Sequence, residues 1–311
     1  MRGITVPTVQ AGHAIGVDLG GTKILAGIVD REGKIVRRHE RPTPQDSQEH
    51  VVAELEAAVA ELLDDSVAAV GFGAPSPIDQ ARGVVVRCVN VPLEDAPLRD
   101  RMRERFGVAV GLDNDANAAA IGEWRAGAGR GVDDLVMLTL GTGLGGGVIS
   151  GGRPFRGANG GGPELGHVVI VHDGLPCQGA CRGRGHLEPY VTGLAATARA
   201  REAFGPAADA HRLIRLANEG DEQARAILAE IGRHLGSGMG SFANVFEPEL
   251  IVIGGGFGVA GWEHLIPSAE EVMRREALRP MRDTVRVAKA ELGTSAGLIG
   301  AGFVAFEAAA A

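Results

Sequence analysis

Side chains that bind polar ligands and metal ions are concentrated in the segment Glu164–Glu188 (ELGHVVIVHDGLPCQGACRGRGHLE). It has a glutamate at each end, three histidines, and two of the three cysteines of the chain. Carboxylates and imidazoles suit the binding of a polyhydroxylated ligand. Cys177, Cys181 and His186 have the spacing of a tetrahedral zinc site, and His167 supplies a fourth ligand upstream. Spacing alone leaves two alternatives to zinc, a chance pair of free thiols and a disulfide between the two cysteines.

Two glycine-rich turns are the next candidates for ligand binding. In Asp18–Lys23 (DLGGTK), the glycines let backbone N–H groups approach an anion, while Thr22 adds a hydroxyl group and Lys23 a positive charge. A plain β-hairpin turn explains this short pattern equally well. The second turn, Gly141–Gly147 (GTGLGGG), matches the G-x-G-x-x-G dinucleotide pattern. We reject a dinucleotide site there because a strand-like segment follows instead of a helix, and the chain also lacks a P-loop motif.

Hydrophobic periodicity predicts the elements that position these residues. The predicted strands are Ala14–Asp18, Ile24–Val29, Lys34–Arg38, Val67–Gly73, Val108–Leu112, Leu135–Leu140, Val148–Ser150, Leu250–Ile253 and Val285–Ala288. The predicted helices are Glu49–Leu63, Asp113–Trp124, Asp221–Asn244, Trp262–Leu278 and Thr294–Ala310. Hairpin strands followed by alternating helices and strands occur in both halves, which predicts a duplicated α/β domain.

Composition argues against several classes of protein. The chain has 311 residues, of which 45% are hydrophobic and 23% charged, a net charge of −8 and a pI near 5.6. A nucleic-acid-binding surface is normally basic, so we expect no nucleic-acid partner. We also expect no membrane span and no signal peptide, because the chain has no run of 18 apolar residues and no apolar segment near its start. Three cysteines make no disulfide framework, so a reducing cytoplasm is the expected location.

Taken together, the motifs resemble those of a known family. In chain order they are DLGGTK, GAPSP, NDANAAA, GTGLGGG, ELGH, the Cys/His segment ending in LE, and IVIGGG. This set, from about Ala14 to the C-terminus, is similar to that of the ROK family of sugar kinases. The resemblance implies an α/β, actin-like (RNase H-like) fold, with a duplicated ATPase domain, two lobes and a central cleft. The small lobe would comprise residues 1–117 and about 295–311, and the large lobe residues 118–294 with the zinc-binding loop.

The resemblance also implies roles in the phosphorylation of a hexose by ATP and Mg²⁺. Asp115 matches the catalytic base, which accepts the proton of the sugar 6-hydroxyl. On local grounds alone, the DND sequence is better explained as the N-cap of the following helix. The implied hexose contacts are Asn114, Asp115, Glu164, His167 and Glu188.

The implied nucleotide contacts lie on the glycine turns. Asp18 helps to hold Mg²⁺, through water because that ion dehydrates reluctantly. The other contacts to the phosphates and the adenosine are Gly20, Gly21, Thr22, Lys23, Gly141, Thr142, Gly143, Gly255 and Gly256.

The metal segment departs from the family pattern. Relatives carry C-x-C-G-x-x-G-C-x-E, which provides three thiolates beside one histidine. Here the first pair is spread to Cys177 and Cys181, and His186 stands at the last cysteine position. With His167, these residues still make a closed Cys2His2 site, so we expect a structural Zn²⁺. His172 is a spare candidate ligand, and Cys88 is expected to be a buried small hydrophobe.

Several alternatives remain open for the substrates. Glucose is the favoured acceptor, but mannose, fructose and N-acetylhexosamines share part of its hydroxyl pattern. A polyphosphate donor would need a basic track, for which scattered arginines exist at positions 153, 156, 182 and 184. The family also includes sugar-responsive transcriptional repressors with an N-terminal helix-turn-helix domain, which the residues before the first predicted strand do not suggest. The resemblance implies a homodimer or homotetramer.

Overall fold

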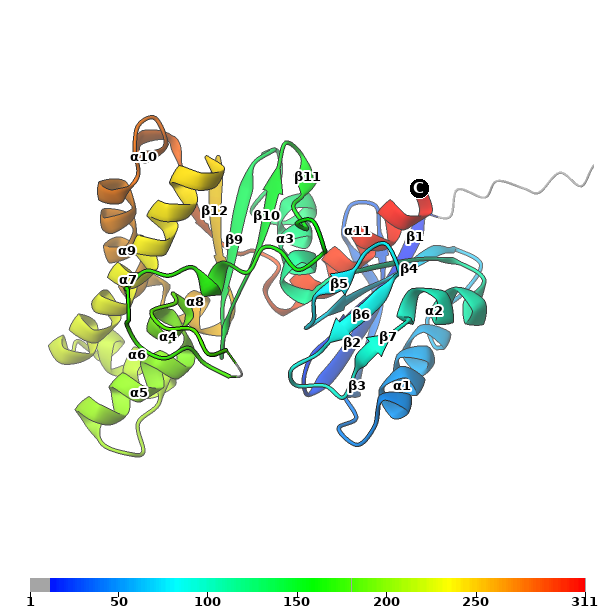
Figure 1. Ribbon diagram of the computed structural model, residues 1–311, viewed down its shortest axis with the longest axis horizontal. Coiled ribbons are helices and arrows are strands. Elements are labelled where there is room, and N and C mark those ends of the chain that lie inside the picture. Colours follow the sequence, from blue (N-terminus) through cyan, green and yellow to red (C-terminus); the bar gives the residue numbers. More distant parts are fainter. Residues whose placement is uncertain (1–11, 180, 311) are drawn as a thin grey trace, which may run out of the picture. The chain divides into compact units, whose positions relative to one another are not determined.

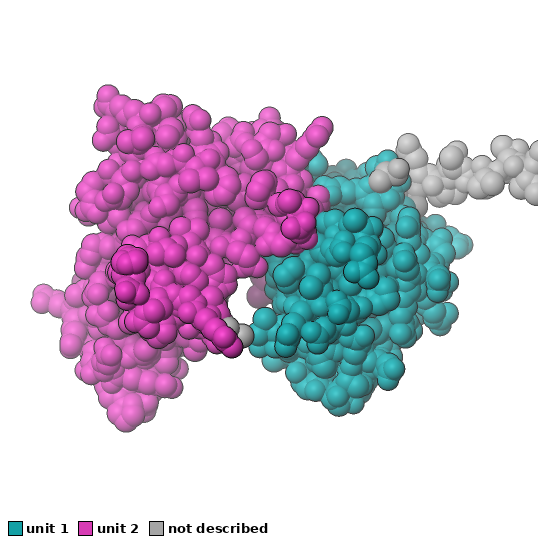
Figure 2. Space-filling view, viewed as in Figure 1, with its two compact units in different colours: residues 1–125, 297–311 teal, residues 126–296 magenta. Residues whose placement is uncertain are grey.

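A computed structural model of the chain describes residues 12–179 and 181–310 (Figure 1). The chain divides into unit 1, made of Met1–Arg125 and Gly297–Ala311, and unit 2, made of Ala126–Ala296 (Figure 2). The lobe boundary expected after residue 117 lies inside helix α3 (Asp115–Ala126), which continues as one helix to the end of the first segment of unit 1.

Unit 1 is built on a five-stranded sheet in the order β3-β2-β1-β4-β8. Its strands are β1 (His13–Leu19), β2 (Lys23–Asp30), β3 (Ile35–Pro42), β4 (Val67–Ala74) and β8 (Ala109–Asn114). β1, β2 and β3 form an antiparallel meander, whereas β1, β4 and β8 run parallel. The near-continuous apolar runs of β1 and β4 are buried, as expected for strands covered on both faces.

Helix α1 (Gln48–Ala60) follows the meander. The Ser47 side chain accepts a hydrogen bond from the His50 N–H and so caps the first turn. Apolar residues at helical spacing, among them Val52 and Leu55, are buried in the core of unit 1. This helix was predicted from its periodicity.

Helix α11 (Ala296–Ala310) lies directly on the parallel part of this sheet. Gly16, Gly71 and Gly111 are register neighbours on β1, β4 and β8. A Cβ atom on these glycines would lie 2.0, 1.9 and 2.4 Å from carbonyl oxygens of α11, so only glycine lets the helix backbone approach. The stretch 293–310 is long and apolar enough to cross a membrane, but 50% of it is buried within the protein and α11 is a core helix of unit 1.

A small second sheet in unit 1 was not predicted. It has the order β5-β6-β7, formed by β5 (Ile78–Asp79), β6 (Val84–Arg87) and β7 (Glu94–Ala96). Helix α2 (Leu98–Phe106) follows it and was also missed, because its sequence is mostly charged and its only buried residues are Leu98 and Met102. Such short or polar elements give little periodic signal.

Unit 2 repeats the sheet plan of unit 1. Its strands are ordered β11-β10-β9-β12-β13, with β9, β10 and β11 antiparallel and β9, β12 and β13 parallel. They are β9 (Leu135–Leu140), β10 (Leu144–Ser150), β11 (Arg153–Pro154), β12 (Leu250–Gly254) and β13 (Arg286–Lys289). The helices are α4 (Glu188–Val191), α5 (Gly193–Phe204), α6 (Ala210–Glu219), α7 (Glu222–Phe246), α8 (Gly256–Ala260), α9 (Trp262–Glu276) and α10 (Met281–Thr284). The same strand order in both units confirms the predicted duplication.

Helices α7 and α9 pack closely in the core of unit 2. α7 begins where Asp221 accepts a hydrogen bond from the Ala224 N–H (2.8 Å). A Cβ atom on Gly232 or Gly236 would lie 2.3 Å from a carbonyl oxygen of α9. As in unit 1, glycine therefore permits direct contact between backbones.

The glycine-rich turn between β9 and β10 is shorter than predicted. Leu144 pairs with Leu140, so only Gly141–Gly143 turn the chain, and the glycines that follow belong to β10. A Cβ atom on Gly146 would lie 2.7 Å from the side chain of Leu165, which packs over this strand. These glycines therefore serve packing, which the sequence alone does not distinguish from a turn. The turn is followed by strand β10, as predicted, and not by the helix that a dinucleotide-binding turn precedes.

Gly71→Ala is expected to destabilise unit 1. The added Cβ atom would lie 1.9 Å from the Ala301 carbonyl oxygen, and both atoms belong to packed backbone. Overpacking of this kind costs about 1–3 kcal/mol, which should lower the thermal midpoint by several degrees in a calorimetric scan. Gly256→Ala is the control, because nothing lies within 4 Å of its added carbon. Equal midpoints for the Gly71 variant and the wild type would contradict the assigned role.

Candidate active site and metal centre

Asp18 and Asp115 lie at the same edge of the unit 1 sheet. Asp18 pairs with Gly73 of β4, and Gly73 pairs with Asp113 of β8. Asp115 follows β8 directly as the first residue of α3. Parallel strands bring their carboxyl ends to one edge, which is where α/β folds place ligand-binding side chains. The structure thus brings together the predicted base and the carboxylate predicted to hold Mg²⁺.

The surroundings of both groups disfavour charge. Burial, together with the nearby Asp115 carboxylate, raises the pKa of Asp18 from 3.8 to about 7, although Lys23 acts in the opposite direction. Burial also raises the pKa of Asp115, despite the hydrogen bond that its Oδ1 accepts from the Ala116 N–H (2.8 Å). A raised pKa makes a carboxylate a stronger proton acceptor, and a cation beside Asp18 would favour its charged form.

Asn114 caps helix α3. Its Oδ1 accepts hydrogen bonds from the N–H groups of Ala116 (2.9 Å) and Asn117 (3.1 Å). The local interpretation of the DND sequence is therefore correct for Asn114, and its side-chain oxygen is engaged. Its amide nitrogen makes a long contact to the carbonyl oxygen of Ser76 (3.5 Å), and its side chain also interacts with the Asp115 carboxylate, which acts against the rise in the pKa of Asp115. Sequence reasoning missed the buried Ser76, whose only signal was its place in the GAPSP turn.

The first glycine turn is supported from the end of β3. The N–H of Gly20 donates to the Lys23 carbonyl oxygen (2.9 Å) and closes the turn. The Thr43 hydroxyl donates to the Gly20 carbonyl oxygen (2.8 Å), and the Gln45 amide donates to that of Gly21 (2.7 Å). These bonds hold carbonyl groups away from the tip of the turn, which suits anion binding by the remaining N–H groups.

Lys23 differs from its expected role in one respect. Its Nζ lies 2.8 Å from Glu40 Oε2 at an exposed position, so a carboxylate already accompanies the charge expected to face an anion. Thr22 is exposed at the tip and borders a cavity of about 700 Å³. This cavity is lined by Gly21, Thr22, Thr43, Gln45, Val89, Asn90, Val91 and Pro92. Asn90 is a second polar residue that sequence reasoning did not select.

In unit 2, the Gly141–Gly143 turn is bonded to the segment that carries Glu188. The Leu144 N–H donates to Glu188 Oε2 (2.9 Å), and the Gly193 N–H donates to the Gly141 carbonyl oxygen (2.9 Å). A Cβ atom on Gly143 would lie 2.9 Å from the same glutamate oxygen. The predicted phosphate turn and a predicted hexose carboxylate therefore form one hydrogen-bonded structure.

Gly255 and Gly256 connect β12 to α8 at the carboxyl end of a parallel strand. Gly255 has a φ of +78°, and a Cβ atom there would lie 2.3 Å from the Leu140 carbonyl oxygen. This contact places the glycine connection beside the start of the Gly141–Gly143 turn. The two predicted nucleotide segments of unit 2 are thus neighbours.

The four predicted metal ligands converge in unit 2. Their ligand atoms all lie within 4.8 Å of one another: His167, Cys177, Cys181 and His186. His167 Nδ1 is 3.2 Å from His186 Nδ1 and 3.5 Å from Cys177 Sγ. Cys181 Sγ is 3.7 Å from His186 Nδ1. A tetrahedral zinc ion has bonds of roughly 2.0 Å to nitrogen and 2.3 Å to sulfur, which separate its ligands by about 3.3–3.8 Å.

This donor set fits Zn²⁺ in chemistry as well as in size. All three cysteines are free, so the alternative of a disulfide is not realised, and Cys88 is buried as expected. Burial and the adjacent Cys181 raise the pKa of the Cys177 thiol to about 11, so thiolates here require a cation. His172 lies outside the cluster.

Two hydrogen bonds tie the metal loop to the helices that follow Glu188. Tyr190, the single tyrosine of the chain, accepts a bond from the Leu175 N–H (2.7 Å) through its hydroxyl. The Gln178 amide donates to the Thr192 hydroxyl (3.1 Å). A metal that orders the loop would therefore also position Glu188, which is the supporting role expected of a closed site. Tyr190 had no sequence signal apart from its rarity.

His167 faces two ways. Its Nδ1 belongs to the metal cluster, whereas its Nε2 lies 3.9 Å from Glu164 Oε2. Glu164 is 59% exposed in its side chain and lies on the side of the imidazole away from the cluster. This geometry suits the two roles predicted for His167, as a zinc ligand through Nδ1 and as a hexose contact through Nε2.

Comparison with known proteins identifies the family. The model of the ROK family matches residues 14–308. The chain belongs to the ROK family. It is 35% identical to the glucokinase of Streptomyces coelicolor, covering 95% of this chain and 98% of that protein, and 36% identical to the glucokinase of Thermotoga maritima, covering 92% and 95%. The crystal structure of a ROK family glucokinase from Streptomyces griseus, in complex with glucose and AMPPNP, matches with a TM-score of 0.80 at 38% identity, covering 95% of this chain and 100% of that one.

These findings confirm the family inferred from the motifs. They also confirm the sugar-kinase class and the actin-like fold, because ROK glucokinases match this chain over almost its whole length in sequence and in structure.

Asp18→Asn is expected to stabilise the metal-free protein above neutral pH. Between about pH 4 and pH 7 the folded chain keeps a proton on Asp18 that the unfolded chain releases, so stability is lost as pH rises through this range. The asparagine variant lacks this loss, and its advantage should grow to at most about 4 kcal/mol. Thermal unfolding in EDTA at about pH 4.5 and pH 8 measures it, with Asp65→Asn, an exposed carboxylate, as the control. An advantage that does not change with pH would contradict the raised pKa.

The purified protein is expected to contain about one zinc ion per chain, since a Cys2His2 set binds one. His186→Ala should abolish the zinc content and lower the thermal midpoint, whereas His172→Ala, outside the cluster, should change neither. His186→Cys should retain zinc, because a thiolate is an equivalent ligand. Elemental analysis and calorimetry measure these outcomes. A wild-type protein without zinc, or zinc loss in the His172 variant, would show that the ligand set is wrong.

Proposed function

We propose that this ROK protein transfers the γ-phosphoryl group of ATP to the 6-hydroxyl group of a hexose, with glucose as the preferred acceptor. The observation that carries this proposal is Asp115, a desolvated carboxylate with a raised pKa at the carboxyl edge of the unit 1 sheet. The glucose and AMPPNP bound by the Streptomyces griseus relative support the two substrates. Free thiols in the metal loop agree with a cytoplasmic enzyme.

Asp115 acts as the general base. It accepts the proton of the sugar hydroxyl as the hydroxyl oxygen bonds to the γ-phosphorus and the bond to the β-phosphate oxygen breaks, which releases ADP. Asp115 Oδ1 is oriented by the Ala116 N–H, and the other oxygen is the proton acceptor. The raised pKa brings its basicity closer to neutral pH without the need for a histidine.

The residues proposed to bind ATP lie mainly on the two glycine-rich turns. N–H groups of Gly20, Gly21 and the Gly141–Gly143 turn donate to phosphate oxygens, and Thr22 and Thr142 add hydroxyl donors. Mg²⁺ neutralises charge that develops on the phosphates when it is bound. Asp18 suits the binding of this ion, because a cation offsets the cost of its buried charge.

The hexose residues provide acceptors and donors for vicinal hydroxyls. Glu188 has one oxygen committed to the Leu144 N–H, so its other oxygen serves the sugar. Glu164 and His167 Nε2 lie together as a second pair of contacts, and the Asn114 amide adds a donor. A substrate analogue that lacks a hydroxyl leaves one of these groups unpaired, which is the physical basis of selectivity.

Asp115→Asn is expected to lower kcat for glucose phosphorylation by roughly a thousandfold while glucose binding stays within a fewfold, because the amide keeps the shape but accepts no proton. A coupled ADP-release assay with glucose, mannose, fructose and N-acetylglucosamine, together with calorimetric binding of glucose, measures both effects. Asp65→Asn, an exposed carboxylate of the same unit, is the matched control. Near-wild-type kcat in the Asp115 variant would remove this residue as the base, and turnover with polyphosphate in place of ATP would overturn the proposed donor.

A further inference from the structure

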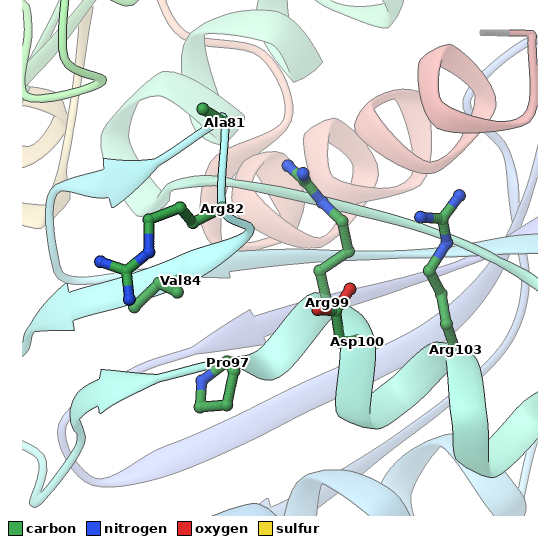
Figure 3. A pocket seen from close by; sticks show the side chains of 7 residues that line it. All are labelled: Ala81, Arg82, Val84, Pro97, Arg99, Asp100 and Arg103. Atoms are coloured by element: carbon green, nitrogen blue, oxygen red, sulfur yellow. The ribbon is translucent and has the colours of Figure 1, made fainter.

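Unit 1 contains a second cavity, of about 430 Å³, that the proposed reaction does not use. It lies between the connection from β5 to β6 and the first turns of α2 (Figure 3). Three arginines, Arg82, Arg99 and Arg103, line it together with a single carboxylate, Asp100. In a chain with a net charge of −8, a lining with an excess of positive charge is unusual.

The arginines of α2 differ in what they contact. Arg101 forms an ion pair with Glu56 (2.6 Å), as an arginine on the surface of an acidic protein commonly does. Arg99 and Arg103 lie one turn apart and flank the cavity, side by side in Figure 3. Within residues 12–179 and 181–310, neither of these two has an ion pair. Like charges four residues apart on a helix repel each other, so an anion between them would relieve a cost built into the helix.

The partly buried Arg99 is held in a defined position. Its side-chain Nη1 donates to the carbonyl oxygen of Gln80 (2.9 Å), and its backbone N–H donates to the carbonyl oxygen of Gly83 (3.2 Å). Gln80 is in turn fixed by a bond from its amide to the Leu112 carbonyl oxygen in β8 (3.0 Å). Because Arg99 bonds a carbonyl group and not a carboxylate, its positive charge is uncompensated. An oriented guanidinium of this kind loses little entropy when it binds an oxyanion.

Arg82 completes the cavity from the opposite side. It is 74% exposed and lies 3.8 Å from Asp79, which is too long for a strong ion pair. In Figure 3 its guanidinium lies apart from those of Arg99 and Arg103, and its exposed side chain can rotate towards an anion held by the two arginines of α2. Phosphate esters suit such planar, forked donors better than carboxylates do, because they present three oxygens and more charge.

We propose that this cavity binds a small phosphate-bearing anion, with the guanidinium groups of Arg82, Arg99 and Arg103 as donors. A volume of about 430 Å³ is in the range of small-molecule sites and accommodates either inorganic phosphate or a hexose phosphate. The phosphate group is the recognised feature in both cases. None of the residues that line the cavity belongs to the proposed reaction, so the proposal stands independently of that reaction.

Calorimetric titration of the full chain with inorganic phosphate and, in a second arm, with glucose 6-phosphate tests the site at constant ionic strength. Arg103→Gln removes a donor that has no partner in the described fold, and Arg82→Gln removes one from the opposite wall. Each should weaken binding of both probes about tenfold, since one charge-assisted hydrogen bond is lost. Arg105→Gln is the matched control, because Arg105 is exposed on the same helix and stacks on Phe106 instead (5.6 Å).

Any other phosphate site is present in the wild type and in all three variants. A difference in binding between these proteins is therefore due to this cavity. Weaker binding in both cavity variants, with the Arg105 variant unchanged, supports the site. If the cavity variants lose more affinity for glucose 6-phosphate than for phosphate, the cavity also recognises a sugar, and an equal loss for both probes shows recognition of the phosphate group alone. Unchanged binding in the cavity variants, or an equal loss in the Arg105 variant, would overturn the proposal, since the effect would then be absent or due to general surface charge.

Discussion

The close backbone contact of helix α11 is the constraint on which the functional part of unit 1 depends. Glycines of three neighbouring strands allow the helix to lie on the sheet, and Gly300 allows it to approach α3. A Cβ atom on Gly297, at the start of the same helix, would lie 2.5 Å from Asp18 Oδ2. α11 therefore packs at once against the strand that ends near Asp18 and the helix that begins with Asp115. The two carboxylates proposed to act in the reaction are thus held by a helix that itself contributes none of the proposed site residues.

This packing buries the carboxyl groups of Asp18 and Asp115, and burial disfavours their charged forms. Desolvation raises the pKa values of both Asp18 and Asp115, so at neutral pH the pair costs stability in the absence of a cation. In the metal loop of unit 2, burial likewise disfavours the charged form of a side chain, because it raises the pKa of the Cys177 thiol. In each unit the unfavourable group becomes favourable when a metal ion binds. Binding of the proposed Mg²⁺ and Zn²⁺ would therefore link stability to function in each unit.

The sequence predicted what periodicity and side-chain chemistry encode locally. Strands β1 and β9, helix α7 and the convergence of the four candidate metal ligands follow from such local patterns, because an amphipathic periodicity or a ligand spacing does not depend on distant contacts. Contacts between distant backbones leave no such pattern. The predicted turn over Gly141–Gly147 includes glycines that belong to β10, because nothing in the local sequence shows that Leu165 packs over them. Ser76 and Tyr190 were missed for the same reason, since each acts through a hydrogen bond to a distant segment.

The histidine at position 186 has a physical consequence for the neighbouring carboxylates. Two thiolates neutralise Zn²⁺, whereas three would leave a net negative charge. Glu188 lies two residues from His186, and Glu164 approaches the second nitrogen of His167. A neutral cluster would repel these carboxylates less than an anionic one. With the proposed Zn²⁺ bound, the same replacement would remove a strong donor to the metal, and the loop would depend more on the bonds to Tyr190 and Thr192. With the proposed Zn²⁺ bound, the departure from the family pattern would exchange metal affinity for weaker repulsion of Glu188, whose Oε2 accepts a hydrogen bond from the Leu144 N–H.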